Sequence, residues 1–400
     1  MARILFLVHR LPYPPNKGDK VRSYHLLKHL VARHEVHLGT FIDDPDDEVH
    51  LPVVRGWCAG LHVARLDPRT ARLKSLMGLL RQEPLTLAYY ADNSLRHWVG
   101  DVTQRLHFDA AIVFSSAMVQ YVLPPKIPTL VDFVDVDSAK WTQYGAEHGW
   151  PLSWLYRREG RALLEYERSV VHQAQASFLV TDKEVALFES LAPDCVGLVH
   201  ASGNGVDAEY YSPDTPHATP FSADEIPIVF TGAMDYKPNV DAVEWFAKDM
   251  LPVLRQRWPR LCFHVVGRSP TAAVQALTAE GVNVTGTVPD VRPFLQHAAV
   301  VVAPLRLARG VQNKILEAMA MARPVVAAVS CADAIDAVPG RDLLAAATAN
   351  DFVASVNGLL QEPQRAAAIG HAARDCVLAG YSWDARLRDL DARLDAVVSS

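Results

Sequence analysis

The stretch Gly310-Val-Gln-Asn-Lys-Ile-Leu-Glu-Ala-Met-Ala-Met-Ala-Arg-Pro324, followed by Val325-Val326-Ala327, predicts a helix that leads directly into a buried strand. Lys314 and Glu317 are three residues apart and therefore share one face of this helix. Apolar residues surround Glu317, and a carboxylate in such company is costly unless it has a partner or lines a cleft. One interpretation is a plain Lys314–Glu317 helix pair, worth about 0.2–0.5 kcal/mol. The other interpretation is a ligand site.

Short apolar runs alternate with helical patterns along the whole chain. In the first half, we expect strands at 4–8, 36–41, 110–114, 129–134 and 177–180. Helical patterns lie between them, at 21–31, 69–82, 154–175 and 182–191. In the second half, we expect strands at 228–231, 262–266, 282–285, 300–303 and 325–328. This alternation predicts an α/β protein with two Rossmann-like domains, each built on a parallel sheet.

The boundary between the two domains is visible in the composition. Residues 208–226 are rich in proline and polar residues and show no periodicity, which is typical of a linker. We therefore expect an N-terminal domain at 1–207, a linker at 208–226 and a C-terminal domain at 227–383. Residues 384–400 form a separate amphipathic helical pattern.

Composition excludes several classes of protein. The net charge of −6 gives no electrostatic basis for binding nucleic acid. The five cysteines are scattered without zinc spacing, which indicates reduced thiols in a cytoplasmic protein. No apolar run reaches the length of a membrane span, so we expect a soluble or peripheral protein. The basic, Leu-rich stretch 65–81 leaves peripheral contact with anionic lipid open, although a solvated helix face explains it equally simply.

Two loops at predicted strand ends have the character of anion sites. Residues 9–19 follow the first strand, and Gly18 and Asp19 stand where the next helix should begin. In the second half, residues 231–239 follow a strand and place Lys237 just before a helix N-terminus, where anions bind. The alternative for both is an ordinary connection with a solvated lysine. However, the first loop is longer than most connections of its kind.

The helix at Glu317, with its Glu-Ala-Met-Ala and Pro-Val-Val sequence, resembles the donor-sugar helix of family 4 glycosyltransferases. That family has the GT-B fold, in which two Rossmann-like domains face each other across a cleft, and its members retain the anomeric configuration. The resemblance implies that Glu317 holds the nucleotide ribose and that the last helix crosses back to the first domain. The family usually has a second glutamate eight residues before Glu317, where this chain has Arg309. It also has an arginine where this chain has Ala233, so Arg309 and Lys314 would supply the missing charge.

The resemblance implies three groups of site residues. The donor would be bound by Gly18, Gly232, Lys237, Gly267, Arg268, Thr287, Val288, Arg309, Gly310, Lys314 and Glu317. Catalysis would involve Asp135, Asp137, Lys237, Arg309 and Lys314. The acceptor would contact Arg10, Lys17, Asp19, Arg22 and Trp141.

The segment Asp132-Phe-Val-Asp-Val-Asp-Ser138 carries three carboxylates that we expect on one face of an extended stretch. The glycine and distal glutamate of a calcium loop are absent, so we expect no metal site. Many family members have a sugar-binding histidine near this segment, and Asp135 or Asp137 would take its place. With the later Arg-rich helix, the segment resembles bacterial sugar transferases associated with exopolysaccharide and PEP-CTERM gene clusters.

The resemblance implies a retaining transferase that moves a sugar from a nucleotide-diphosphate sugar to a glycan or lipid-linked acceptor. It implies no metal and no cofactor, so that cationic side chains stabilise the charge on the leaving diphosphate. Two alternatives remain, namely a non-catalytic GT-B binding protein and a GT-B nucleotide-sugar epimerase. The changes at Arg309 and Ala233 favour the first of these, whereas the intact Lys314–Glu317 helix opposes it.

Overall fold

The computed structural model describes residues 1–15, 18–76, 78–79, 83–124, 126–307 and 311–399. The chain divides into two compact units, of which the first comprises Met1–Asn204 with Arg386–Ser400 and the second Gly205–Ala385. The last segment of the chain therefore belongs to the first unit. None of the described helices has the length and apolar character needed to cross a membrane.

The first unit is built on a seven-stranded parallel sheet with the strand order β3-β2-β1-β4-β5-β6-β7. The strands are β1 (Arg3–Val8), β2 (Glu35–Ile42), β3 (Gly60–Arg65), β4 (Ala110–Phe114), β5 (Thr129–Val134), β6 (Ala176–Leu179) and β7 (Val199–Ala201). Its longer helices are α1 (Gly18–Val31), α2 (Leu51–Trp57), α3 (Pro68–Ser75), α6 (Asn93–Arg105), α7 (Asp137–Glu147), α8 (Leu152–Gln173), α9 (Asp182–Leu191) and α19 (Arg388–Val398). Both faces of the sheet are covered by buried apolar clusters, as expected for a doubly wound α/β unit.

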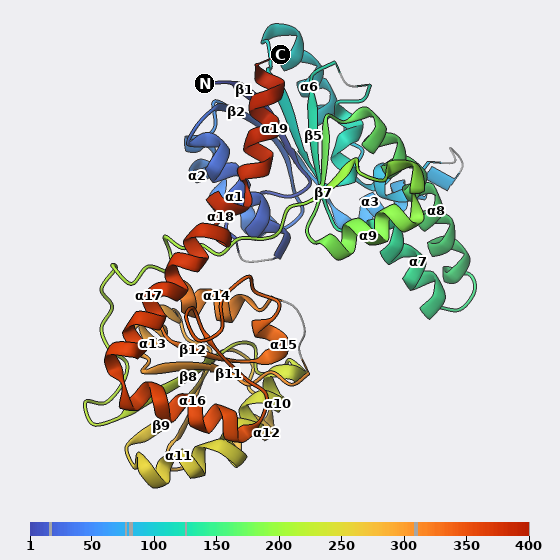
Figure 1. Ribbon diagram of the computed structural model, residues 1–400. Helices are drawn as coiled ribbons and strands as arrows, with labels where there is room; N and C mark the ends of the chain where they lie inside the picture. Colours follow the sequence, from blue (N-terminus) through green and yellow to red (C-terminus); the bar gives the residue numbers. More distant parts are fainter. Residues whose placement is uncertain (16–17, 77, 80–82, 125, 308–310, 400) are drawn as a thin grey trace. The chain divides into compact units, whose positions relative to one another are not determined.

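The C-terminal helix α19 packs on one face of this first sheet (Figure 1). Its buried leucines, Leu390 and Leu394, belong to the same apolar cluster as Leu27 of α1. Asp391 Oδ1 lies 2.7 Å from His29 Nε2 at the edge of this contact. The amphipathic pattern at the chain end thus covers apolar surface of the first unit.

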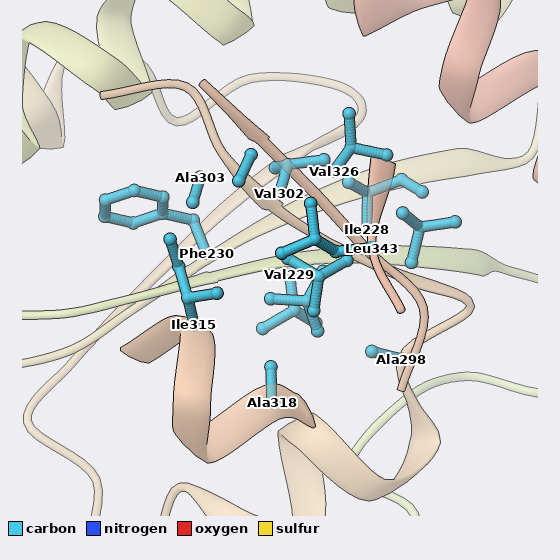
Figure 2. Close-up of a cluster of buried hydrophobic side chains, with 14 of the residues drawn as sticks. Ile228, Val229, Phe230, Ala298, Val302, Ala303, Ile315, Ala318, Val326 and Leu343 are labelled. Atoms are coloured by element: carbon cyan, nitrogen blue, oxygen red, sulfur yellow. The ribbon is translucent and has the colours of Figure 1, made fainter. Parts of the chain in front are cut away.

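The second unit repeats the arrangement with the strand order β10-β9-β8-β11-β12-β13, again entirely parallel. The strands are β8 (Ile226–Thr231), β9 (Leu261–Val266), β10 (Val282–Gly286), β11 (Val300–Ala303), β12 (Val325–Ala328) and β13 (Leu344–Ala346). Its helices include α10 (Lys237–Trp245), α11 (Leu251–Arg257), α13 (Arg292–His297), α14 (Asn313–Ala320), α16 (Ala349–Gln361) and α17 (Pro363–Gly380). Valines and other apolar side chains of the strands pack against Ile315 and Ala318 of α14 (Figure 2).

Both expected Rossmann-like sheets are therefore present, and each predicted strand is confirmed to within two residues at its ends. Three further strands, β3, β7 and β13, were not expected. The helix expected at 69–82 is present as α3, which ends at Ser75, and residues 77 and 80–82 lie outside the described part. In doubly wound sheets, ligands bind at the carboxyl ends of the strands where the strand order reverses. In these two units the reversals lie between β1 and β4 and between β8 and β11.

Candidate functional site

A cavity of about 640 Å³ lies at the carboxyl ends of β8, β9 and β10 in the second unit. The first turns of helix α14 form another wall of this cavity. Its lining residues are Tyr211, Thr231, Gly232, Ala233, Asn239, Val266, Gly267, Arg268, Thr287, Val288, Val291, Val311, Gln312, Asn313, Lys314 and Glu317. Seven of the predicted donor residues meet here, namely Gly232, Gly267, Arg268, Thr287, Val288, Lys314 and Glu317.

Two glycines allow the strand-end loops to approach each other and the lysine. Gly232 has φ 154° and Gly267 has φ 151°, backbone conformations that other residues rarely adopt. A Cβ on Gly267 would lie 1.7 Å from the carbonyl oxygen of Gly232. A Cβ on Gly232 would lie 2.7 Å from Lys314 Nζ. The two strand-end loops therefore expose backbone to the cavity, which suits close approach of a ligand.

Lys314 is a half-buried cation that lines this cavity. Its Nζ donates a hydrogen bond to Asn239 Oδ1 at 2.6 Å and lies 4.1 Å from the centroid of the Phe230 ring. Burial lowers its pKa to about 7, although the nearby Glu317 carboxylate acts in the opposite direction. An anion beside Nζ would stabilise the ammonium form, so this group is suited to a phosphate ligand.

Glu317 stands one turn further along α14 and is also half-buried. Burial raises its pKa to about 6, while Lys314 and a hydrogen bond from the Tyr211 hydroxyl lower it. Within the described residues no ion pair joins Glu317 to Lys314, so the simple helix pair considered from the sequence is not formed. A carboxylate held in this way can accept hydrogen bonds from a pair of ligand hydroxyls.

The other predicted donor residues are not among those that line this cavity. Lys237 begins helix α10, is exposed and is not among the residues that line the cavity, so its contact with the donor stays a prediction. Asn239, in the first turn of the same helix, is buried and lines the cavity. Arg309 and Gly310 lie outside the described residues, and Gly18 begins α1 in the first unit.

Asn239 and Tyr211 are the functional candidates that sequence reasoning missed. Asn239 Nδ2 donates to the Ala233 carbonyl at 2.8 Å while its Oδ1 accepts from Lys314, so it links the glycine turn to the lysine. Its only sequence signal was a polar residue just inside a helix. Tyr211 came from the presumed linker, where nothing indicated a site.

A second cavity, of about 870 Å³, lies at the carboxyl ends of β1, β4 and β5 in the first unit. The predicted residues Asp135, Asp137 and Trp141 line it together. Most of the remaining wall is aromatic or aliphatic, and includes His9, Leu76, Leu85, Tyr89, Tyr90, Phe114, Phe133, Leu155 and Tyr156. None of these residues was singled out from the sequence.

The three carboxylates of the Asp132 segment do not share one face, contrary to expectation. Asp132 is buried, and its Oδ2 accepts from Arg22 Nε at 2.7 Å. Lys140 Nζ lies 2.7 Å from Asp135 Oδ2 and 3.2 Å from Asp137 Oδ1, in the cavity wall. The reason is that β5 ends at Val134, whose φ is 71°, and a spacing of three places Asp132 and Asp135 on opposite sides.

Asp137 is a cavity carboxylate with a shifted pKa. Burial raises its pKa, and the Lys140 ammonium partly opposes that shift. Asp135 and Asp137 therefore share one cation in a largely apolar wall, which makes them hydrogen-bond acceptors for ligand hydroxyls.

The predicted acceptor residues are only partly gathered at this cavity. Trp141 lines it, but Arg10 does not, and Arg10 Nη2 pairs with Asp43 Oδ2 at 2.7 Å. Arg22 is 2% exposed, does not line the cavity and also donates to Asn204 Oδ1, and its contact with the acceptor stays a prediction. Lys17 and the side chain of Asp19 lie outside the described residues.

Glu159 holds one wall of this cavity in place. Its carboxylate is buried and accepts hydrogen bonds from the backbone N–H groups of Leu85 at 2.7 Å and Thr86 at 2.9 Å. These are the first residues of helix α5 (Leu85–Tyr89), whose orphan N–H groups need an acceptor. Glu159 thereby positions Tyr89 and Tyr90 in the wall of this cavity.

Glu167 of α8 is a buried carboxyl group behind the Asp135 turn. It is 1% exposed, its Oε2 accepts from the Ser138 hydroxyl at 2.5 Å, and its Oε1 has no partner among the described residues. Burial raises its pKa to about 8. Glu167 is thus protonated in the folded protein at neutral pH.

Replacing Glu167 by glutamine should therefore change the pH dependence of stability. The unfolded carboxyl ionises near pH 4.5, whereas the folded one holds its proton to about pH 8. As the pH rises from about 4.5 to about 8, the free energy of unfolding of the wild type should fall by a few kcal/mol, because only the unfolded carboxyl ionises. The free energy of unfolding of Glu167→Gln should fall less over the same range. Denaturant unfolding at pH 5, 7 and 9 measures the difference. The exposed Glu165→Gln, on the same helix, is the control, and parallel curves for Glu167→Gln and wild type would contradict the assignment.

Among the described residues, two side-chain groups have the composition of metal sites, and neither lines either cavity. One consists of His172, Asp194 and Cys195, and the other of Glu225, Cys262 and His264. Neither group contributes a residue to the described lining of the donor cavity.

The second unit resembles a known protein family, and the whole chain resembles several solved structures. Residues 225–362, which lie in the second unit and make up less than half of the chain, match the family model described as "Glycosyl transferases group 1". A search of curated protein sequences finds no match.

Several solved structures share the whole fold. Anabaena Alr3699/HepE, determined in complex with UDP, is 14% identical with a TM-score of 0.60, over 98% of this chain and 100% of that one. A glycosyltransferase from Rickettsia africae is 13% identical with a TM-score of 0.62, covering 100% and 99% of the two chains. Sucrose-phosphate synthase from Thermosynechococcus elongatus is 16% identical with a TM-score of 0.57, covering all of both chains. The fold is GT-B, with two Rossmann-like α/β domains.

Proposed function

We propose that this protein is a retaining glycosyltransferase that uses a nucleotide-diphosphate sugar as donor. The observation that carries this proposal is the assembly of Lys314, Glu317 and the two glycine turns around one cavity. That cavity lies in the segment that matches the group 1 glycosyltransferase model. The UDP complex of Anabaena Alr3699/HepE supports a nucleotide as ligand of this fold.

Each part of the donor has a chemically suitable partner in the cavity. Glu317 would accept hydrogen bonds from the ribose hydroxyls, and Thr287 and Val288 would lie beside the base. The diphosphate would lie between Lys314 and Arg268, with the backbone of Gly232 below it. The guanidinium of Arg268 is exposed and makes no ion pair with other described residues, so it is available to an anion.

The reaction would depend on stabilising charge at the leaving group. As the bond between the sugar and the phosphate breaks, negative charge grows on the diphosphate, and the Lys314 ammonium would offset it. Cationic side chains would do this without a metal ion or cofactor. We propose retention of configuration and membership of family 4 on the resemblance of the Glu317 helix alone.

The acceptor would bind in the aromatic cavity of the first unit. Its wall offers flat apolar faces from Trp141 and Tyr156 and carboxylate acceptors from Asp135 and Asp137. This combination suits a molecule with both apolar surface and hydroxyl groups, such as a glycan or a lipid-linked sugar. A role in bacterial exopolysaccharide synthesis, on the cytoplasmic side of the membrane, follows from the sequence resemblance.

A non-catalytic nucleotide-binding protein is the second candidate. Ala233 lines the donor cavity at the position where the resemblance to family 4 implies an arginine, so one expected diphosphate contact would be missing. Such a protein would bind the nucleotide sugar but would neither transfer nor hydrolyse it. Turnover therefore separates the two candidates where binding does not.

Thermal unfolding with a panel of UDP-, GDP-, ADP- and dTDP-sugars tests the proposal. One nucleotide class should raise the Tm of the wild type, because a ligand at about 100 times its Kd adds about 2.7 kcal/mol of stability. Glu317→Ala should lose most of this shift, because the ribose loses its acceptor. The exposed Glu280→Ala should keep it. An equal shift in wild type and Glu317→Ala would place the nucleotide elsewhere.

A further inference from the structure

The hairpin formed by α7 and α8 ends in an exposed group of aromatic and apolar side chains. Trp150 is 84% exposed, Trp154 55%, Tyr144 45% and Leu152 43%. They belong to the end of α7, the connecting loop and the first turn of α8 (Figure 1). Exposing a tryptophan to water is costly. Trp150 and Trp154 lie within five residues of each other with Leu152 between them, so they form an apolar tip rather than scattered surface residues.

The hairpin is closely packed, so this exposure is built into the fold. A Cβ on Gly160 of α8 would lie 2.3 Å from Thr142 Oγ1 of α7. A Cβ on Gly145 would lie 2.7 Å from Cγ of Arg157. Thr142 also donates to the Ser138 carbonyl at 3.0 Å. Glycines at the helix contact let the two backbones approach, which holds the tip in a fixed position.

The part of the hairpin next to the tip has an excess of basic side chains, whereas α7 and α8 taken whole carry five acidic and five basic ones. Residues 140–161 contain four basic side chains, Lys140, Arg157, Arg158 and Arg161, and two acidic ones, Glu147 and Glu159. The chain as a whole carries a net charge of −6. Arg157 and Arg161 are exposed on α8, directly behind the apolar tip. A basic flank behind exposed tryptophans complements an anionic lipid surface.

We propose that the tip defined by Tyr144, Trp150, Leu152 and Trp154 docks in the interfacial layer of an anionic lipid membrane. Tryptophan and tyrosine favour the headgroup level of bilayers, because each side chain combines an apolar ring with a polar N–H or O–H group. The arginines behind the tip then lie beside lipid phosphates. The bound state is peripheral and reversible, because a few aromatic side chains do not anchor a protein permanently.

The tip is continuous with the aromatic cavity of the first unit. Tyr144 contacts Trp141 and Tyr156, with ring centroids 6.0 and 6.4 Å apart, and both partners line that cavity. A membrane held at the tip therefore adjoins the cavity through an unbroken aromatic surface. If the cavity binds the acceptor, as the proposed function has it, the acceptor is carried by a lipid of that membrane. This last step rests on the proposed function, whereas membrane docking does not.

Co-sedimentation with vesicles tests the docking proposal. The full chain should bind vesicles of phosphatidylcholine with about one-third phosphatidylglycerol and bind pure phosphatidylcholine much more weakly. The double variant Trp150→Ser/Trp154→Ser should reduce partitioning at least about tenfold. Arg157→Gln/Arg161→Gln should reduce it about fivefold for each charge removed. Tryptophan fluorescence of the wild type should be quenched by lipid with brominated acyl chains, and less so in the Trp150/Trp154 variant.

Controls separate docking from misfolding and from other partners. Val196→Ser/Leu198→Ser removes exposed apolar side chains elsewhere in the first unit and should leave vesicle binding unchanged. The nucleotide-induced Tm shift should persist in the tip variants, so loss of docking and loss of donor binding are distinguishable. Vesicle binding that survives Trp150→Ser/Trp154→Ser would overturn the proposal. So would self-association, abolished by that variant, in a protein that binds no vesicles.

Discussion

Replacing Lys314 by methionine is expected to lower the rate of sugar transfer by about 10²–10³-fold, the usual cost of losing one group that stabilises transition-state charge. Methionine keeps the length of the side chain but removes the ammonium that lies on the cavity floor. Asn239 Oδ1 would also lose its partner at 2.6 Å. Steady-state kinetics with the nucleotide sugar that stabilises the protein measure the effect, which should appear mainly in kcat.

Two other lysines make this result interpretable. Lys248→Met removes an exposed lysine that pairs with Glu244 of helix α10 and does not line the cavity, and it should leave the rate within about twofold of wild type. Lys237→Met separates geometry from sequence resemblance. The resemblance gives Lys237 a diphosphate contact, whereas the structure places it outside the cavity lining. A loss at Lys237 as large as that at Lys314 would contradict the donor site described above.

Asp132→Ala is expected to destabilise the protein by about 3–5 kcal/mol, because it leaves the buried Arg22 guanidinium without its counter-charge. Asp132 Oδ1 additionally accepts a hydrogen bond from the Val134 N–H at 3.1 Å, which is lost as well. Chemical denaturation followed by circular dichroism measures the change.

The matched control for Asp132 is another aspartate–arginine pair of the first unit. Asp43 pairs with Arg10 at 2.7 Å but both side chains are partly exposed, so Asp43→Ala should cost about 1 kcal/mol or less. The double variant Arg22→Met/Asp132→Ala should recover part of the loss, since no charge then remains buried. A loss below about 1 kcal/mol for Asp132→Ala would show that Arg22 reaches solvent or another partner.

The strands of the two sheets could be predicted where burial on both faces produces a continuous apolar run. β8, β11 and β12 are examples, since nearly all their residues are buried. The missed strands lie at or near sheet edges. β3 has mostly half-buried residues, and β7 and β13 have three residues each, which leaves little pattern to detect.

The donor cavity could be predicted where a charged residue stands in apolar surroundings. Glu317 and Lys314 gave that signal, and the glycine turns marked the strand ends. Asn239 and Tyr211 gave none, because an uncharged polar residue acquires its role only through tertiary contacts. The pairing of Arg22 with Asp132 could not be predicted either, since the two residues are 110 positions apart. Sequence patterns predict where strands end, but they do not predict which side chains are partners across the sheet.

The most direct measurement is a crystal structure of the protein soaked with the nucleotide sugar that gives the largest thermal shift. The account predicts the ribose hydroxyls on the Glu317 carboxylate and the diphosphate beside Lys314 Nζ, with the phosphate oxygens over the Gly232 turn. A nucleotide bound outside this cavity, or an empty cavity at saturating nucleotide sugar, would contradict the central claim.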